Sequence, residues 1–117
     1  MGEETQVATR VRDDVAIIDI KGEVTSFAEQ VLEDAYAQLT DAGFTCIGFN
    51  FSDVSYINSA GMAILIGILT KSRKRNQTLL AWGLTEHFQK IFGMVGITKY
   101  MPHLENEDAA LSYVKQQ

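Results

Sequence analysis

Cysteine and long hydrophobic runs are the scarcest features of this 117-residue sequence. Its single cysteine, Cys46, cannot form an internal disulfide, and its apolar surroundings indicate a small buried hydrophobic residue rather than a reactive thiol. The longest apolar run, residues 62–69, falls far short of the roughly 20 residues that span a bilayer, so we expect no membrane insertion. The first residues show no secretory signal pattern, and the sequence therefore predicts a cytoplasmic protein.

Sequence motifs of common enzymes are also missing. The chain contains no glycine-rich dinucleotide fingerprint, no phosphate-binding loop and no nucleophile elbow. Its two histidines, His87 and His103, have no further histidine, cysteine or carboxylate at a metal-ligand spacing. We therefore expect a protein that is not an enzyme and that needs neither a cofactor nor a metal.

Basic residues are outnumbered, with 10 lysines and arginines against 15 acidic residues and a formal charge of −5. Nucleic-acid binding requires a basic surface, so this balance argues against direct contact with DNA or RNA. One local exception is the segment 71–75, which carries four of the basic residues. It follows an apolar helical stretch, and cations in a last helical turn complement the helix dipole.

The beginning of the chain predicts two strands and a helix. Residues 6–12 alternate between apolar and polar side chains, and residues 15–20 are almost continuously apolar, which is typical of a β-hairpin. From Phe27 to Leu39 the apolar residues recur at helical spacing. We expect Ser26 to cap this helix, with Glu29 at the capping-box position, and Gly43 to end it.

Strands and helices then alternate to the end of the chain. Residues 45–51 and 78–82 read as strands, and the apolar segment 60–70 between them suits a helix buried against a sheet. Thr85 is a good N-cap for a helix with Phe88, Ile91, Phe92 and Val95 on its apolar face. Residues 97–101 are the expected last strand, and Asn106 caps a terminal helix.

This order predicts one domain over residues 1–117 in the α/β class. The expected architecture is a mixed, mostly parallel sheet of four to five strands with helices packed on it and an opening β-hairpin. A chain of this length fits a single domain. The predicted core contains apolar residues at strand and buried-helix positions: Ile17, Ile20, Phe49, Phe51, Ile64, Leu65 and Leu80.

The segment from Asn58 to Met62 is the candidate site. In the simpler interpretation, Ser59 or Asn58 is the N-cap of the following helix. In the functional interpretation, Ala60 and Gly61 leave the Ser59 hydroxyl open to the close approach of another protein. A phosphate on Ser59 would also meet the N–H groups and positive dipole of a helix N-terminus.

The order and spacing of these segments resemble the STAS domain of anti-sigma-factor antagonists. The resemblance runs from about Val7 to Val114, through Gly22-Glu23-Val24, residues 49–54, the Trp82-Gly-Leu segment and residues 92–97. Its most diagnostic part is Ser59-Ala60-Gly61, after an apolar strand and before an apolar helix.

The resemblance implies a partner-switching function regulated by phosphorylation. Anti-sigma-factor antagonists bind an anti-sigma factor that is also a serine kinase, which phosphorylates the serine matching Ser59, and a serine phosphatase reverses this. A phosphate brings a charge of about −1.5 to −2, which a tight interface does not tolerate. The expected partner-binding residues are Glu23, Thr25, Ser26, Asn58, Ser59, Ala60, Gly61 and Met62.

The sequence departs from the usual antagonist pattern where Asn58, Asn50 and Thr25 stand in place of aspartates. These residues keep hydrogen bonding but remove charge. An alternative is therefore a STAS adaptor that is never phosphorylated, in a lipid-transport ATPase complex or a stress-sensing scaffold. A nucleotide-binding domain is a third possibility, although no phosphate-cradling loop supports it. The partner's identity and the oligomeric state do not follow from the sequence.

Overall fold

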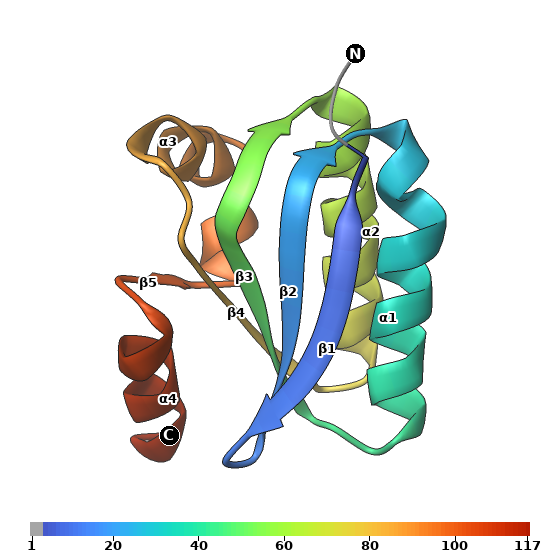
Figure 1. Ribbon diagram of the computed structural model, residues 1–117. Helices are drawn as coiled ribbons and strands as arrows, with labels where there is room; N and C mark the ends of the chain where they lie inside the picture. The colour runs from blue at the N-terminus through green and yellow to red at the C-terminus, as the bar shows by residue number, and fades with distance from the viewer. Residues whose placement is uncertain (1–3) are drawn as a thin grey trace.

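A computed structural model describes residues 4–117, and it contains one five-stranded sheet (Figure 1). The strands are β1 (Gln6–Arg12), β2 (Val15–Val24), β3 (Cys46–Ile57), β4 (Thr78–Trp82) and β5 (His103–Leu104). They lie in the order β1-β2-β3-β4-β5, with β1 and β2 antiparallel and every other pair parallel. The opening hairpin and the mixed, mostly parallel sheet expected from the sequence are both confirmed.

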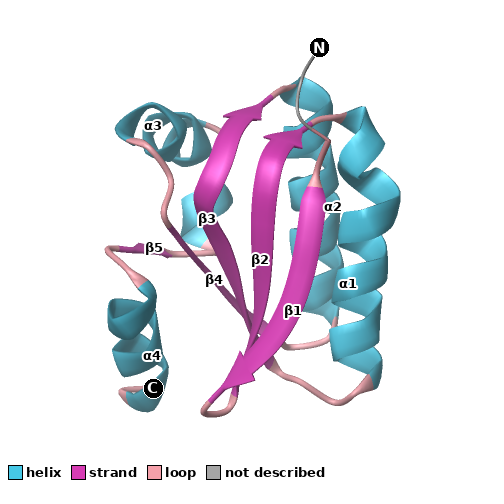
Figure 2. Ribbon diagram, in the orientation of Figure 1, coloured by secondary structure: helices cyan, strands magenta, loops and turns pink. Residues whose placement is uncertain are grey.

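Helices cover both faces of this sheet (Figure 2). The longer elements are α1 (Glu29–Asp41), α2 (Ser59–Lys74), α3 (Glu86–Met94) and α4 (Glu107–Lys115), and the short 3₁₀ turns are η1 (Ser26–Ala28) and η2 (Ile97–Lys99). Helices α1 and α2 pack on one face and share the larger apolar cluster with β2 and β3. Helix α4 packs on the other face, over a smaller cluster that includes Ile17, Leu80 and Trp82. Among the described residues, no helix is both long and apolar enough to cross a membrane.

All seven predicted core residues are buried, and they divide between the two clusters. Phe49, Phe51 and Ile64 belong to the cluster beneath α1 and α2, whereas Ile17 and Leu80 belong to the cluster beneath α4. The alternation of side chains along a strand explains this division, because neighbouring strand residues point to opposite faces. Burying each of these side chains contributes about 1.5–3 kcal/mol to folding.

The prediction of a strand at residues 97–101 is wrong. Gly96 adopts a left-handed conformation with φ of 85°, and the chain then forms the 3₁₀ turn η2. The carbonyl of Ile97 accepts the N–H groups of Tyr100 and Met101, at 3.1 and 2.9 Å. Ile97 and Met101 are both buried, so their four-residue spacing reflects one turn of helix rather than a strand. The last strand instead begins at His103, beside Ala81 of β4.

Two details of the predicted helices also differ. Thr25, not Ser26, caps the first helical turn, because its Oγ1 accepts the N–H of Phe27 at 3.3 Å. The turn that follows is 3₁₀, and it places Phe27 outward with 91% of its surface exposed. Val95, expected on the apolar face of its helix, is 53% exposed, since α3 ends at Met94 and Val95 follows it.

Strands β2 and β3 extend further than their apolar runs indicated. The predicted strands stopped at residues 20 and 51, whereas β2 continues to Val24 and β3 to Ile57. The register between them shifts at Asp19/Lys21 and at Gly22/Glu23. The predictions ended both strands where apolar residues give way to polar ones, at Lys21 and at Ser52, which was too early. The two strands end side by side, with Val24 opposite Ile57.

Candidate functional site

The loop between β3 and α2 is held by its own helix cap. Asn58 has an extended backbone, and its Oδ1 accepts the N–H of Gly61 at 2.9 Å. The Asn58 carbonyl accepts the N–H of Met62, also at 2.9 Å. Asn58 is therefore the N-cap of α2.

Because Asn58 provides the cap, Ser59 is left without a structural role for its hydroxyl. Ser59 occupies the first position of α2 and is exposed. Its hydroxyl makes no hydrogen bond to any other residue among 4–117. No acidic residue stands in the first turn of α2, so the positive end of this helix dipole is not neutralised within its own first turn. The site thus presents a free hydroxyl at a helix N-terminus.

Gly61 serves a different purpose from the one expected. It is buried, and a Cβ on Gly61 would lie 2.1 Å from the carbonyl oxygen of Val24. The N–H of Asn58 donates to the same carbonyl at 3.1 Å. The missing side chain of Gly61 therefore admits the end of β2, not an approaching protein. The expectation that Gly61 gives a partner direct access is corrected accordingly.

The second predicted segment, Glu23 to Ser26, lies beside this loop, as expected for the carboxyl ends of adjacent parallel strands. Thr25 follows Val24 just as Asn58 follows Ile57, and those two strand residues are register partners. Glu23, Thr25, Ser26 and Asn58 line one common groove. The structure thus brings the two predicted segments together.

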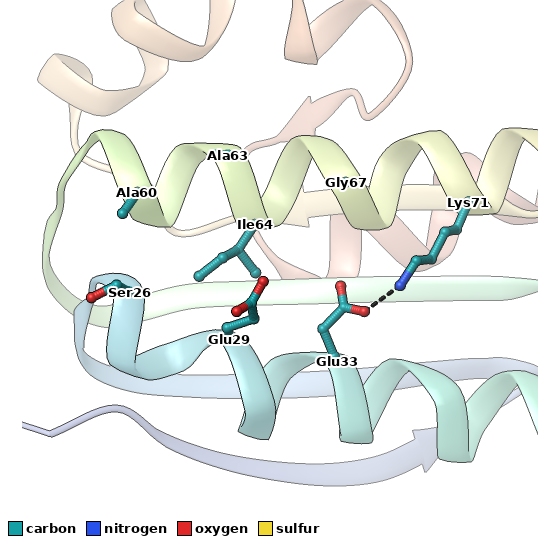
Figure 3. Close-up of a pocket in the computed structure, with 8 residues that line it drawn as sticks. All are labelled: Ser26, Glu29, Glu33, Ala60, Ala63, Ile64, Gly67 and Lys71. Atoms are coloured by element: carbon teal, nitrogen blue, oxygen red, sulfur yellow. Dashed lines mark hydrogen bonds and ion pairs between the residues drawn. The ribbon is translucent and has the colours of Figure 1, made fainter.

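A groove of about 430 Å³ runs between α1 and α2 and begins at this site (Figure 3). Ser26 and Ala60 lie at one end, and the small residues Ala63 and Gly67 line the side formed by α2. At the other end, Lys71 forms an ion pair with Glu33 (Figure 3). The groove stays open because three of its α2 positions carry little or no side chain.

A larger groove, of about 900 Å³, shares Ser26 of η1 with the first. Phe27, Gln30 and Val31 line it together with Thr25 and Asn58. Phe27 was expected on the apolar face of the first helix, and helical periodicity gave no sign of its exposure, because it is the 3₁₀ geometry of η1 that turns it outward. It is the most exposed large hydrophobic residue among those described.

The remaining predicted site residues differ in their access to solvent. Ala60 and Met62 are half-buried, and Met62 packs against the core cluster. Ser26 and Ser59 are exposed. Together with the half-buried groove residues Glu23, Thr25 and Asn58, these side chains form the accessible part of the site.

The chemically reactive side chains elsewhere have structural surroundings. Cys46 is buried under α4, and its burial raises the pKa of the thiol. The Nε2 of His103 accepts the N–H of Leu84 at 3.1 Å, and burial lowers the pKa of this imidazole. Within residues 4–117, no three histidine, cysteine, aspartate or glutamate residues are grouped so as to hold a metal ion.

Comparison with known proteins agrees with this arrangement. A family model described as the STAS domain matches residues 6–110. The anti-sigma-B factor antagonist of Staphylococcus epidermidis is 23% identical over 95 residues, covering 81% of this chain and 88% of the relative. The crystal structure of an anti-sigma factor antagonist from Mycobacterium paratuberculosis superposes with a TM-score of 0.82 at 20% identity, covering 95% of this chain and 94% of the other. The Bacillus cell fate determinant SpoIIAA, in its phosphorylated form, gives a TM-score of 0.70 at 20% identity, over 94% and 98% of the two chains.

Proposed function

Because the chain belongs to the STAS-domain family, we propose that it acts as an anti-sigma-factor antagonist. In this function the protein binds an anti-sigma factor that is also a serine kinase, and so frees a sigma factor. Phosphorylation of Ser59 by that kinase ends the interaction, and a serine phosphatase restores it. The protein itself is a binding switch in the cytoplasm rather than an enzyme.

The observation that carries this proposal is the environment of the Ser59 hydroxyl. Ser59 is exposed at the start of α2, while Asn58 supplies the helix cap with its own side chain. The hydroxyl can therefore be modified without breaking a contact that holds the fold. Two similar proteins support the same function. One is named an anti-sigma-B factor antagonist, and the other is a fold neighbour whose structure was solved in a phosphorylated form.

The physical effect of the modification follows from its position. A phosphate on Ser59 meets the free N–H groups of the first turn of α2, which favour an anion by about 0.3–1 kcal/mol, so the fold tolerates it. The same group carries about −1.5 to −2 charges into the surface beside Ala60 and Met62. Burying such a charge without a partner costs several kcal/mol, enough to release a bound protein.

The test combines capture of the partner with intact-mass measurement. The tagged protein is used to capture partners from the cell that encodes it, and the captured anti-sigma factor is then purified and incubated with the protein and ATP. We expect the mass of the parent protein to increase by one phosphate and the mass of Ser59→Ala to stay unchanged. We also expect Ser59→Asp to capture the anti-sigma factor at least tenfold more weakly than the parent. Ser112→Asp, at an exposed serine of α4, is the matched control and should bind like the parent.

Either of two results would contradict the proposed phosphorylation switch. In the first, incubation with the kinase and ATP leaves the mass of the parent protein unchanged. In the second, Ser59→Asp binds the anti-sigma factor as tightly as the parent does. A protein that still binds an assembly under those conditions is the non-phosphorylated adaptor that Asn58, in place of an aspartate, also allows.

A further inference from the structure

Phe27 is an aromatic side chain that the fold itself does not use. Its surface is 91% exposed, whereas its neighbour Ala28 is fully buried and begins the apolar contact of α1 with the sheet. Aromatic residues of this size normally contribute to folding by burial. A phenylalanine left in solvent beside a groove therefore marks a surface that another molecule covers.

The groove beside Phe27 has an acidic and polar lining. Glu4, Glu23 and Asp34 provide three carboxylates, and none of the described residues that line the groove is a lysine, arginine or histidine. Within residues 4–117 none of the three carboxylates has an ion-pair partner, in contrast to Asp19, Glu33 and Glu107. No ion pair among the described residues thus neutralises the charge of this groove.

Hydrogen-bond acceptors and donors are held in place around the same groove. Gln30 donates from its Nε2 to Asp34 Oδ1 at 2.8 Å, which fixes that carboxylate on the surface of α1. The Thr5 hydroxyl donates to the carbonyl of Glu23, which ties the start of β1 to the end of β2. The lining is therefore arranged before any ligand arrives, and arranged groups bind with a smaller loss of entropy.

From the exposed ring and the unneutralised carboxylates, we propose that this groove receives an arginine side chain of the partner protein. A guanidinium group stacks on an aromatic face and donates in its plane to carboxylates, which matches Phe27 together with Glu23 and Asp34. This inference rests on the proposed function, and it specifies the chemistry of the partner's docking segment as basic.

The groove is continuous with the surface around Ser59. Thr25 and Asn58 line it, and Asn58 immediately precedes Ser59. A partner that inserts an arginine here therefore also covers the start of α2. Ser26 lines both this groove and the groove between α1 and α2, so the two grooves meet at η1.

The first experiment needs no partner. The isotope-labelled protein is titrated with N-acetyl-arginine amide and followed by NMR, with N-acetyl-citrulline amide as the uncharged control of the same shape. We expect saturable shifts at the amides of Thr25, Phe27 and Asn58 with arginine, and responses at least fivefold smaller with citrulline. Phe27→Ala should abolish the arginine response, and Phe27→Tyr should restore it. Equal responses to both compounds, or shifts confined to other surfaces, would overturn the inference.

The second experiment uses the captured anti-sigma factor. Phe27→Ala and Asp34→Asn should each weaken binding about tenfold or more, as truncation of a central contact does. Asp41→Asn, at the far end of the same helix, is the matched control and should bind like the parent. If Ser59→Asp weakens binding while the Phe27 and Asp34 variants do not, the switch stands and the arginine site is wrong. If the arginine compound binds the groove but no anti-sigma factor is captured, the proposed function is wrong, whereas the inference that the groove binds arginine stands.

Discussion

Gly61 and Val24 are in direct backbone contact at the candidate site, so close that a Cβ on Gly61 would lie 2.1 Å from the Val24 carbonyl oxygen. That carbonyl also accepts the N–H of Asn58. One carbonyl at the end of β2 therefore sets the position of the cap and of the first turn of α2. The geometry of the Ser59 surface depends on this contact.

Gly61→Ala is expected to destabilise the protein by about 1–3 kcal/mol, because the added methyl group must displace backbone rather than a flexible side chain. The control is Gly67→Ala, in the same helix, where a Cβ meets nothing within 4 Å. That change should stabilise the helix by about 0.5–1 kcal/mol. Urea denaturation of both variants checks the prediction, and equal effects of the two substitutions would contradict it.

Asn58→Ala removes the side-chain cap of α2 and should cost about 1 kcal/mol of folding free energy. Asn58→Asp keeps an acceptor oxygen and adds a charge favoured by the helix dipole, so its stability should equal or exceed that of the parent. Urea denaturation at neutral pH measures both. The cap assignment is wrong if Ala at this position is as stable as Asp.

A charged replacement of Ala63 should interfere with the partner without unfolding the domain. Ala63 is exposed and lines the groove between α1 and α2, so Ala63→Arg fills the groove while leaving the core intact. We expect at least tenfold weaker capture of the partner. Thr70→Arg, exposed further along the same helix, is the control. Unchanged capture by Ala63→Arg, with an unchanged circular dichroism spectrum, would exclude this groove from the interface.

The ion pairs that fasten α4 to the hairpin predict a pH dependence. Hydrogen bonds from Arg10 lower the pKa of Glu107 from 4.5 to about 2, and Arg12 adds to this. A lowered pKa in the folded state means that the stabilisation is fully present above pH 4.5 and is lost as the pH falls toward 2. Because Glu107 is only partly buried and its arginine partners are exposed, we expect Glu107→Gln to cost only about 0.2–1 kcal/mol per pair at pH 7.

Denaturation at several pH values between 2 and 7 tests this dependence. The stability difference between the parent and Glu107→Gln should shrink below pH 4.5. Glu86→Gln is the matched control, since Glu86 holds the same first position of α3 and has no ion-pair partner among residues 4–117. Its difference from the parent should be smaller at pH 7. An unchanged Glu107→Gln difference at pH 2.5 would contradict the ion-pair explanation.

Cys46 should be unreactive in the folded protein, because it is buried and burial raises the pKa of its thiol. Ellman's reagent at pH 7.5 should label it only as fast as the protein opens, and at once in 6 M guanidinium. Ser112→Cys adds an exposed thiol as a positive control, and one thiol per molecule of this variant should react rapidly with the reagent. Rapid labelling of Cys46 in the folded parent would overturn its assignment as a core residue.

Local patterns in the sequence determined most of the fold. The alternation in residues 6–12 and the apolar run in residues 15–20 fixed the hairpin, and the caps at Thr85 and Asn106 were read correctly, since each accepts the N–H three residues ahead. Such features depend on residues close in the chain, so sequence alone reveals them. The two site segments were also placed together correctly, because parallel strands end at one edge of a sheet.

Only the tertiary structure decided the character of the site. The sequence did not choose between Asn58 and Ser59 as the cap, and it suggested an open Gly61 where the fold requires a contact with Val24, more than thirty residues earlier. Helical periodicity also placed Phe27 on the apolar face of the first helix. A single 3₁₀ turn, η1, rotates that ring into solvent, because a tighter turn changes which side chains share a face. Contacts between distant segments and small changes in helical geometry leave no periodic trace in the sequence, and those two effects shape the surface around Ser59.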